Sequence, residues 1–275
     1  MSELTVLFVG DLCGKPGRQA ASYIIRELRR ERDIDYVIAN VENAAGGFGV
    51  TPEMSAKIFS YGVDLQTSGN HIWDRVQILD YLKETPKLLR PGNYPHGAPG
   101  SGVYIDEVNG AKIAVMNLMG RTYMAATDCP FRTADRELRK IHTETNVVIL
   151  DFHAEATSEK QAMAFHLDGK ISALVGTHTH VPTADESISR NGTAYITDVG
   201  MTGPHDSIIG MDKGPSLGRF MTGMPKRFAT ATDDVRLNGV LLQIDAETGK
   251  ALTIERIRKD FDLGEYQSGT NDEEV

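Results

Sequence analysis

Short apolar runs with strand character alternate with helical patterns along the first part of this chain. Three such runs are Leu4–Gly10, Tyr36–Val41 and Val63–Ser68. The helical patterns that follow them begin at Pro16, at Thr51 and near Arg75. The first pattern places four apolar side chains on one helical face, namely Ala20, Ile24, Ile25 and Leu28. Such alternation is typical of βαβ units, in which parallel strands form a sheet covered by helices.

Two hairpins add antiparallel strands to this pattern. The first lies between Val103–Val108 and Lys112–Leu118, where Asn109-Gly110 is a strong turn signal. The second joins Gly239–Asp245 to Ala251–Ile257. We therefore predict an α/β fold in which two mixed sheets pack face to face with helices outside. We expect a single domain over residues 1–263 and a disordered acidic tail over 264–275.

The composition limits the class of protein. The chain has 275 residues, a formal net charge of −9 and 40% hydrophobic residues, which suits a globular protein and excludes collagen or a membrane-embedded chain. The acidic balance argues against a stable complex with nucleic acid, whose phosphates attract basic faces. Because two cysteines cannot form a disulfide framework and the N-terminus lacks the layout of a signal peptide, we predict a cytoplasmic protein without a membrane partner.

Polar side chains able to bind metals follow five of the predicted strands. They are Asp11, Glu42, Asn43, Asn70, His71, His153, His178 and His180. Each alone has a simpler explanation, since Asp and Asn after a strand are usually turn or cap residues and a lone His is usually hydrogen-bonded in the core. The carboxyl ends of parallel strands meet at one edge, however, so we expect the set to converge. His178 and His180 would point the same way in an extended segment.

Seven of these residues form a ligand set suited to two metal ions. Three imidazoles, two carboxylates and two amides are too many donors for one tetrahedral ion. Mixed nitrogen and oxygen donors without thiolates favour iron, Mn²⁺ or Zn²⁺. Two such ions about 3.5–4 Å apart can hold a phosphoryl group between them and generate hydroxide at neutral pH. The sequence therefore predicts a dinuclear site.

Several short motifs resemble a known family. Gly69-Asn70-His71 and Gly176-Thr177-His178-Thr179-His180 are similar to the signature of the calcineurin-like metallophosphoesterases. The segments that resemble the bacterial YmdB branch more narrowly are Val9–Gly14, Asn40–Ala44, Asn117–Arg121 and Thr197–Gly203. The resemblance extends from Leu4 to about Asp260. It implies a four-layer α/β/β/α sandwich and a metal-dependent hydrolase.

The resemblance also implies how the ligands are divided. One ion would be held by Asp11, Glu42, Asn43 and His180, and the other by Glu42, Asn70, His153 and His178. The broad superfamily usually has Asp-x-His in its first motif and a bridging Asp, whereas this chain has Cys13 at the histidine position and Glu42-Asn43 in the second motif. Replacing an imidazole by an amide weakens the preference for nitrogen-loving ions. We expect two ions, iron or manganese, with zinc as the alternative.

The implied activity is the hydrolysis of small phosphodiesters, with 2′,3′-cyclic nucleotides favoured over 3′,5′-cyclic nucleotides because their strained ring needs little recognition beyond the metals. A metal-bound hydroxide would attack phosphorus in line. His71, adjacent to Asn70, would point the other way in an extended segment and protonate the leaving alkoxide. Its alternative role is that of a supporting or core histidine. Two other functions stay open: a phosphomonoesterase acting on nucleotides or phosphoproteins, and a regulatory binding protein with a structural metal site.

A second group of residues is predicted to contact or support the substrate site. Arg121 would hold a phosphate bidentately, unless it forms a surface ion pair. Asp198 and His205 lie beside or within the Gly- and Met-rich stretch Gly200–Met224, which is long for a structureless connection and would cover the substrate. Asp151 would orient the histidine two residues later, with a simple strand-end carboxylate as the alternative. The hairpin edges leave open both a homo-oligomer and edges covered within the chain.

Overall fold

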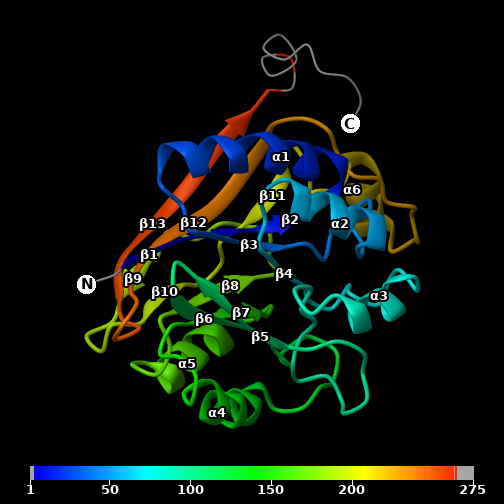
Figure 1. The fold of residues 1–275 in the computed structure, drawn as a ribbon. Coiled ribbons are helices and arrows are strands. Elements are labelled where there is room, and N and C mark those ends of the chain that lie inside the picture. Colours follow the sequence, from blue (N-terminus) through cyan, green and yellow to red (C-terminus); the bar gives the residue numbers. More distant parts are fainter. Residues whose placement is uncertain (1–2, 263, 265–275) are drawn as a thin grey trace.

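Two mixed β-sheets lie face to face in the computed structural model, which describes residues 3–262 and residue 264 (Figure 1). The first sheet has the order β2 (Asp11–Leu12), β11 (Met201–Pro204), β12 (Val235–Asp245), β1 (Glu3–Val9), β3 (Tyr36–Asn40) and β4 (Leu65–Thr67), and β13 (Ala251–Phe261) also pairs with β12. The second has the order β5 (Val103–Val108), β6 (Ala111–Met119), β7 (Val148–His153), β8 (Ala173–Thr177), β10 (Ala194–Ile196) and β9 (Ser187–Ile188). Strands joined through helices run parallel, as the alternation predicts: β1, β3 and β4 in the first sheet, and β6, β7 and β8 in the second.

Five of the described helices cover the outer faces of the sheets: α1 (Gly14–Glu31), α2 (Pro52–Ser60), α3 (Ile78–Glu84), α4 (Pro130–Ile141) and α5 (Thr157–Leu167). Buried residues of α1, α2 and α3 share one apolar cluster with the first sheet, and those of α4 and α5 share another with the second sheet. A further helix, α6 (Lys213–Thr222), is mostly exposed and joins neither cluster. A third cluster, with Phe8 from β1 and Ile149 from β7, fills the space between the sheets. The predicted α/β/β/α sandwich is confirmed (Figure 1).

Local sequence signals explain several of these elements. In α1 the predicted face, with Ile24 and Leu28, is buried. Thr51 caps α2 by accepting a hydrogen bond from the Met54 backbone N–H at 3.3 Å. Asn109 and Gly110 have φ angles of 51° and 80°, as a two-residue hairpin turn requires, and they join β5 to β6.

The stretch Gly200–Met224 is not a structureless connection. It contains β11, which pairs with β2 and β12, and the helix α6. Neither element has a clear local signal, because β11 is only four residues long and α6 contains Gly214, Pro215 and Gly218, which are poor helix formers. Elsewhere the boundaries shift, and α3 begins at Ile78 rather than near Arg75.

The predicted tail over 264–275 lies, apart from residue 264, outside the described residues, as does the expected boundary at residue 263. Among the helices that the structure describes, none combines the length and the apolar character needed to cross a membrane.

Candidate active site

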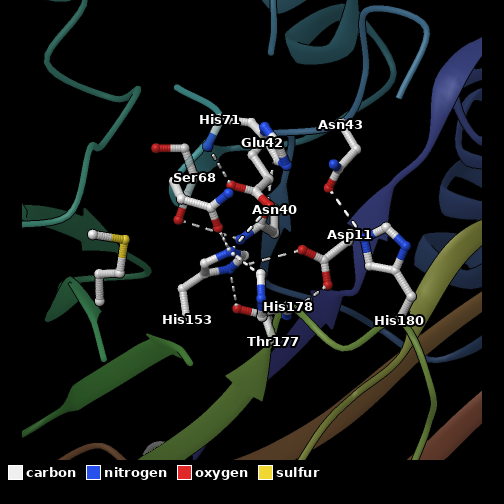
Figure 2. A network of polar contacts seen from close by, with 12 residues as sticks. Asp11, Asn40, Glu42, Asn43, Ser68, His71, His153, Thr177, His178 and His180 are labelled. Carbon is white, nitrogen blue, oxygen red and sulfur yellow. Dashed lines mark hydrogen bonds and ion pairs between the residues drawn. The ribbon is translucent and has the colours of Figure 1, made fainter. Parts of the chain in front are cut away.

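The structure brings together the polar residues at the ends of five strands. Asp11 follows β1, the pair Glu42-Asn43 follows β3, and the pair Asn70-His71 follows β4, all in the first sheet. His153 ends β7, and His178 and His180 follow β8 in the second sheet. Figure 2 shows the side chains of Asp11, Glu42, His153 and His178 pointing toward one another, with Asn43 beside His180. The site therefore draws on both sheets rather than on the edge of one.

His153 lies at the centre of the first group of contacts. Its Nε2 atom is 3.0 Å from Glu42 Oε1, 3.1 Å from Asn70 Oδ1 and 3.0 Å from His178 Nδ1. Burial disfavours the charged forms of both His153 and Glu42, but their mutual attraction and hydrogen bond outweigh it. The pKa of His153 is consequently raised to about 9 and the pKa of Glu42 is lowered to about 2. One Nε2 proton faces three acceptors, which is more than it can satisfy.

Asp11, Asn43 and His180 form a second group beside the first. His180 Nε2 lies 3.3 Å from Asn43 Oδ1, and burial lowers the pKa of His180, which favours the neutral imidazole. Asp11 Oδ2 accepts a hydrogen bond from the His178 backbone N–H at 3.3 Å. Asp11 Oδ1 is buried and has no hydrogen-bond partner among the described residues; it lies 3.9 Å from His153 Nδ1. Burial raises the pKa of Asp11 well above its usual range.

Both groups fit metal cations. Buried acceptors that face one another, including one without a partner, are costly unless a cation satisfies them. The donors are carboxylate, amide and imidazole atoms, the set that iron, manganese and zinc accept. Glu42, His153 and His178 each offer a ligand atom, and the three atoms lie within 4.8 Å of one another. Cys13 takes no part, because it packs against Met201 and Met211 and burial raises its pKa to about 12.

The segment that carries His178 and His180 is not extended. Their φ angles are 99° and 66°, in the left-handed region that non-glycine residues rarely adopt. The two rings consequently serve different groups, and the expectation that they point the same way by strand geometry is wrong. Asp198 holds this turn, because its Oδ2 accepts hydrogen bonds from the Thr179 backbone N–H at 3.0 Å and hydroxyl at 2.8 Å. The buried Lys160 pairs with the same oxygen at 2.8 Å.

Polar contacts fix which nitrogen of His153 and of His178 faces the centre. Thr177 donates its hydroxyl hydrogen to Asp151 at 2.7 Å and accepts the Nδ1–H of His153 at 2.9 Å, which leaves Nε2 for the centre. Asp151 thus orients His153 through Thr177, not directly. On His178, Nε2 lies 3.1 Å from Glu155, so Nδ1 carries the inward lone pair. Burial and the neighbouring His153 lower the pKa of His178 to about 3.

His71 lies in a turn at the mouth of the site. Its backbone N–H donates to Glu42 Oε2 at 3.1 Å, and its ring Nδ1 lies 2.8 Å from Asp74 Oδ2. The ring borders the cavity described below. The neighbouring Gly69 is required by close approach: a Cβ added there would lie 2.2 Å from His153 Nε2 and 2.3 Å from Glu42 Oε2.

A cavity of about 700 Å³ opens onto these side chains. At one end its lining consists of Glu42, Asn43, His71, Glu155, His178, Thr179 and His180. The rest is formed by Gly47 and Phe48 and by a segment from Ile208 to Phe228 that includes α6. Much of the stretch Gly200–Met224 is therefore a wall of the cavity.

Three residues predicted to contact the substrate lie outside this lining in the described part of the chain. Arg121 is exposed, with Nη2 3.5 Å from Cys129 Sγ. Asp198 is buried beneath the histidine turn, and His205 bonds to the Gly203 carbonyl and to Asn238. No sequence signal marks Glu155, Arg219 or Phe228, because these residues reach the cavity from an exposed loop and from the segment around α6.

Comparisons with known proteins show which family this chain is similar to. A family model described as YmdB-like protein matches residues 7–257. A Bacillus subtilis (strain 168) protein named 2′,3′-cyclic-nucleotide 2′-phosphodiesterase is 46% identical over 254 residues, which cover 92% of this chain and 96% of that protein.

Two crystal structures are also similar. A hypothetical protein from Thermus thermophilus has a TM-score of 0.88 and 41% identity, covering 94% of this chain and 99% of the other. A protein from Mycoplasma pneumoniae described as a novel phosphatase has a TM-score of 0.90 and 35% identity, covering 98% and 97%.

Proposed function

Because the chain belongs to the YmdB-like protein family, we propose that it is a metal-dependent phosphodiesterase that hydrolyses 2′,3′-cyclic nucleotides. The chain is a hydrolase of the metallophosphoesterase type, since its relatives are named phosphodiesterase and phosphatase. The observation that carries the proposal is the group of buried acceptors around His153 Nε2, which one proton cannot satisfy. A site built to be neutralised by cations suits an anionic phosphodiester.

The residues divide into two ligand groups. Asp11, Asn43 and His180 would hold one ion; Asn70, His153 and His178 would hold the other; and Glu42 would bridge them, since its two oxygens can each bind one ion. When bound, the ions supply a hydroxide nucleophile at neutral pH and neutralise charge on the phosphoryl oxygens. Iron or manganese is the expected metal, with zinc as the alternative.

His71 is proposed to protonate the leaving oxygen. Its Nδ1 is engaged by Asp74, which fixes the ring and leaves Nε2 as the nitrogen available to the cavity. Transfer of the Nε2 proton to the oxygen of the breaking P–O bond would avoid a poorly stabilised alkoxide. The cytoplasmic location and a homo-oligomer stay predictions.

The experiment compares hydrolysis of bis-p-nitrophenyl phosphate and p-nitrophenyl phosphate by protein stripped of metal and resupplied with Mn²⁺. We expect metal-dependent cleavage that favours the diester, and we expect Asn70→Ala to lower it by about 100-fold. Asn191→Ala, on an exposed loop, serves as the control.

Two outcomes would contradict the proposal. A monoester rate more than tenfold above the diester rate would indicate a phosphomonoesterase. Cleavage of neither substrate by protein that binds the metal would indicate a binding protein.

A further inference from the structure

The cavity at the candidate active site has two chemically different ends. The end beside the strand termini is lined by carboxylate, amide and imidazole groups. The other end is lined by the aromatic rings of Phe48, Phe220 and Phe228 and by the aliphatic side chains of Ile208, Ile209 and Met211. The proposed phosphodiester chemistry uses only the first end, so the second end has no role in it.

The aromatic end directly adjoins the reactive end. The Phe48 ring contacts the His71 ring edge-on, with centroids 5.1 Å apart. A molecule whose phosphate lies beside His71 therefore has an aromatic surface within reach of its next group.

The aromatic end rests on a packed base. Phe48 and Phe228 are partly buried and pack against the buried cluster of Cys13, Met201 and Met211. Arg219 places its guanidinium carbon 5.4 Å from the centre of the Phe228 ring. In the part of the chain that the structure describes, Arg219 is the only Lys or Arg in the cavity lining. These contacts restrict the motion of the Phe228 ring, which lowers the cost of ordering it on binding.

We propose that this aromatic end, formed by Phe48, Phe228 and Arg219, is a subsite that binds the nucleobase of the substrate by stacking. The inference rests on the proposed function, and it assigns a binding place to the nucleobase in addition to the phosphate. A volume of about 700 Å³ falls within the range of sites that enclose a nucleotide-sized ligand. A flat, apolar base matches an aromatic wall, whereas the ribose and phosphate match the polar end.

The subsite is expected to tolerate different bases. Ser216 and Arg219 are the polar side chains that α6 contributes to the lining, and aromatic faces stack on any base. We therefore expect kcat/KM values for the four 2′,3′-cyclic nucleotides to lie within about tenfold of one another. Purines should be preferred, because their larger rings stack over more area.

The test compares a substrate that has a base with one that lacks it. The substrates are 2′,3′-cyclic AMP and glycerol 1,2-cyclic phosphate, each assayed with metal-loaded protein. The variants are Phe228→Leu and Phe48→Leu, which keep an apolar side chain but remove the aromatic face. The measured quantity is the ratio of kcat/KM for the nucleotide to that for the glycerol compound, so that any loss of folded or metal-loaded protein cancels.

We expect Phe228→Leu to lower this ratio at least tenfold, with a rise in KM for the nucleotide, and Phe48→Leu to lower it in the same direction. Phe165→Leu, which changes an exposed aromatic residue of α5 away from this cavity, should leave the ratio at the wild-type value. Unchanged ratios in both cavity variants would overturn the inference.

Failure of the proposed function is distinguishable from failure of the subsite. If the wild-type protein cleaves neither cyclic phosphate, the proposed function fails, and titration calorimetry with adenosine 3′-monophosphate then decides the subsite. Affinity that falls at least tenfold in Phe228→Leu would support it. Equal affinity in the wild-type protein and the variant, or no binding by either, would overturn it.

Discussion

Glu155 is an exposed residue whose carboxylate lies 3.1 Å from His178 Nε2. By accepting the Nε2–H, it keeps the Nδ1 lone pair of His178 directed at His153 and Glu42. We expect Glu155→Ala to weaken Mn²⁺ binding by about tenfold and Glu155→Gln, which keeps an acceptor oxygen, to weaken it less. Titration calorimetry on the stripped protein measures this, with the exposed Glu84→Ala as the control. Equal affinities for all four proteins would show that His178 is oriented by its backbone alone.

Lys160 is a buried cation that supports the histidine turn. Its Nζ lies 2.8 Å from both Asp198 Oδ2 and the Thr177 carbonyl oxygen. Lys160→Met leaves the buried Asp198 carboxylate without its cation, so we expect the free energy of unfolding to fall by about 3–5 kcal/mol. Urea unfolding measures the change. Lys213→Met, which removes an exposed pair with Asp206, should not change it, and equal effects of the two substitutions would contradict the argument.

The convergence of the candidate ligand residues could be predicted from the sequence, because they follow strands whose ends must meet. Their local backbone could not. His178 and His180 adopt positive φ angles in a turn that Asp198 and Lys160 hold from positions distant in the sequence. For the same reason Glu155 carries no sequence signal, since its partner His178 belongs to a different loop.

At the scale of elements, residues 213–228 form an excursion whose two ends lie side by side. The Asp212 backbone N–H donates to the Ala229 carbonyl at 2.9 Å, and Met211 and Thr230 form an isolated antiparallel β-bridge. In α6 only Ser216 is buried. We expect replacement of residues 213–228 by a short Gly-Ser linker to leave the melting temperature within a few degrees of the wild-type value, because little apolar surface is lost.

The same replacement should raise KM for 2′,3′-cyclic AMP at least tenfold, since it removes Arg219 and Phe228 from the cavity. Calorimetry and steady-state kinetics measure the two effects. A collapse of the melting temperature would show instead that the excursion is part of the core.

Helices such as α1 were predictable from an apolar face, whereas α6 was not, because most of its side chains are exposed and its glycines are poor helix formers.

At the scale of the whole molecule, the proposed metal ions would compete with a proton for one site. In the metal-free protein the pKa of His153 is raised to about 9, because its attraction to Glu42 outweighs the effect of burial. A raised pKa stabilises the fold below the unfolded value of about 6.5, and this stabilisation is lost as the pH rises through about 9. We therefore expect the melting temperature of stripped protein to fall between pH 6.5 and 9.

Mn²⁺ must displace that proton, so its affinity should rise over the same pH interval by up to about tenfold per pH unit. Scanning calorimetry of stripped and Mn²⁺-loaded protein at several pH values measures the gap between their melting temperatures, which should widen with pH. A gap that narrows between pH 6.5 and 9 would contradict this account.

The division into two sheets could be predicted from the two hairpins, but the order of strands in the first sheet could not. There β1 lies between β3, the strand that follows α1, and β12, more than 200 residues later in the sequence. No local pattern specifies a partner so remote, because the pairing depends on both apolar faces being buried together.

That pairing has a consequence for folding during synthesis. Leu7 pairs with Leu241, so one edge of β1 has no native strand partner until the segment around Leu241 has left the ribosome. At 5–20 residues per second the wait is roughly 10–50 s. An apolar strand with an open edge for that time can pair with other chains. The open edge of β1 therefore persists until β12 emerges, and the candidate active site, whose residues come from both sheets, cannot be complete before His180 has left the ribosome.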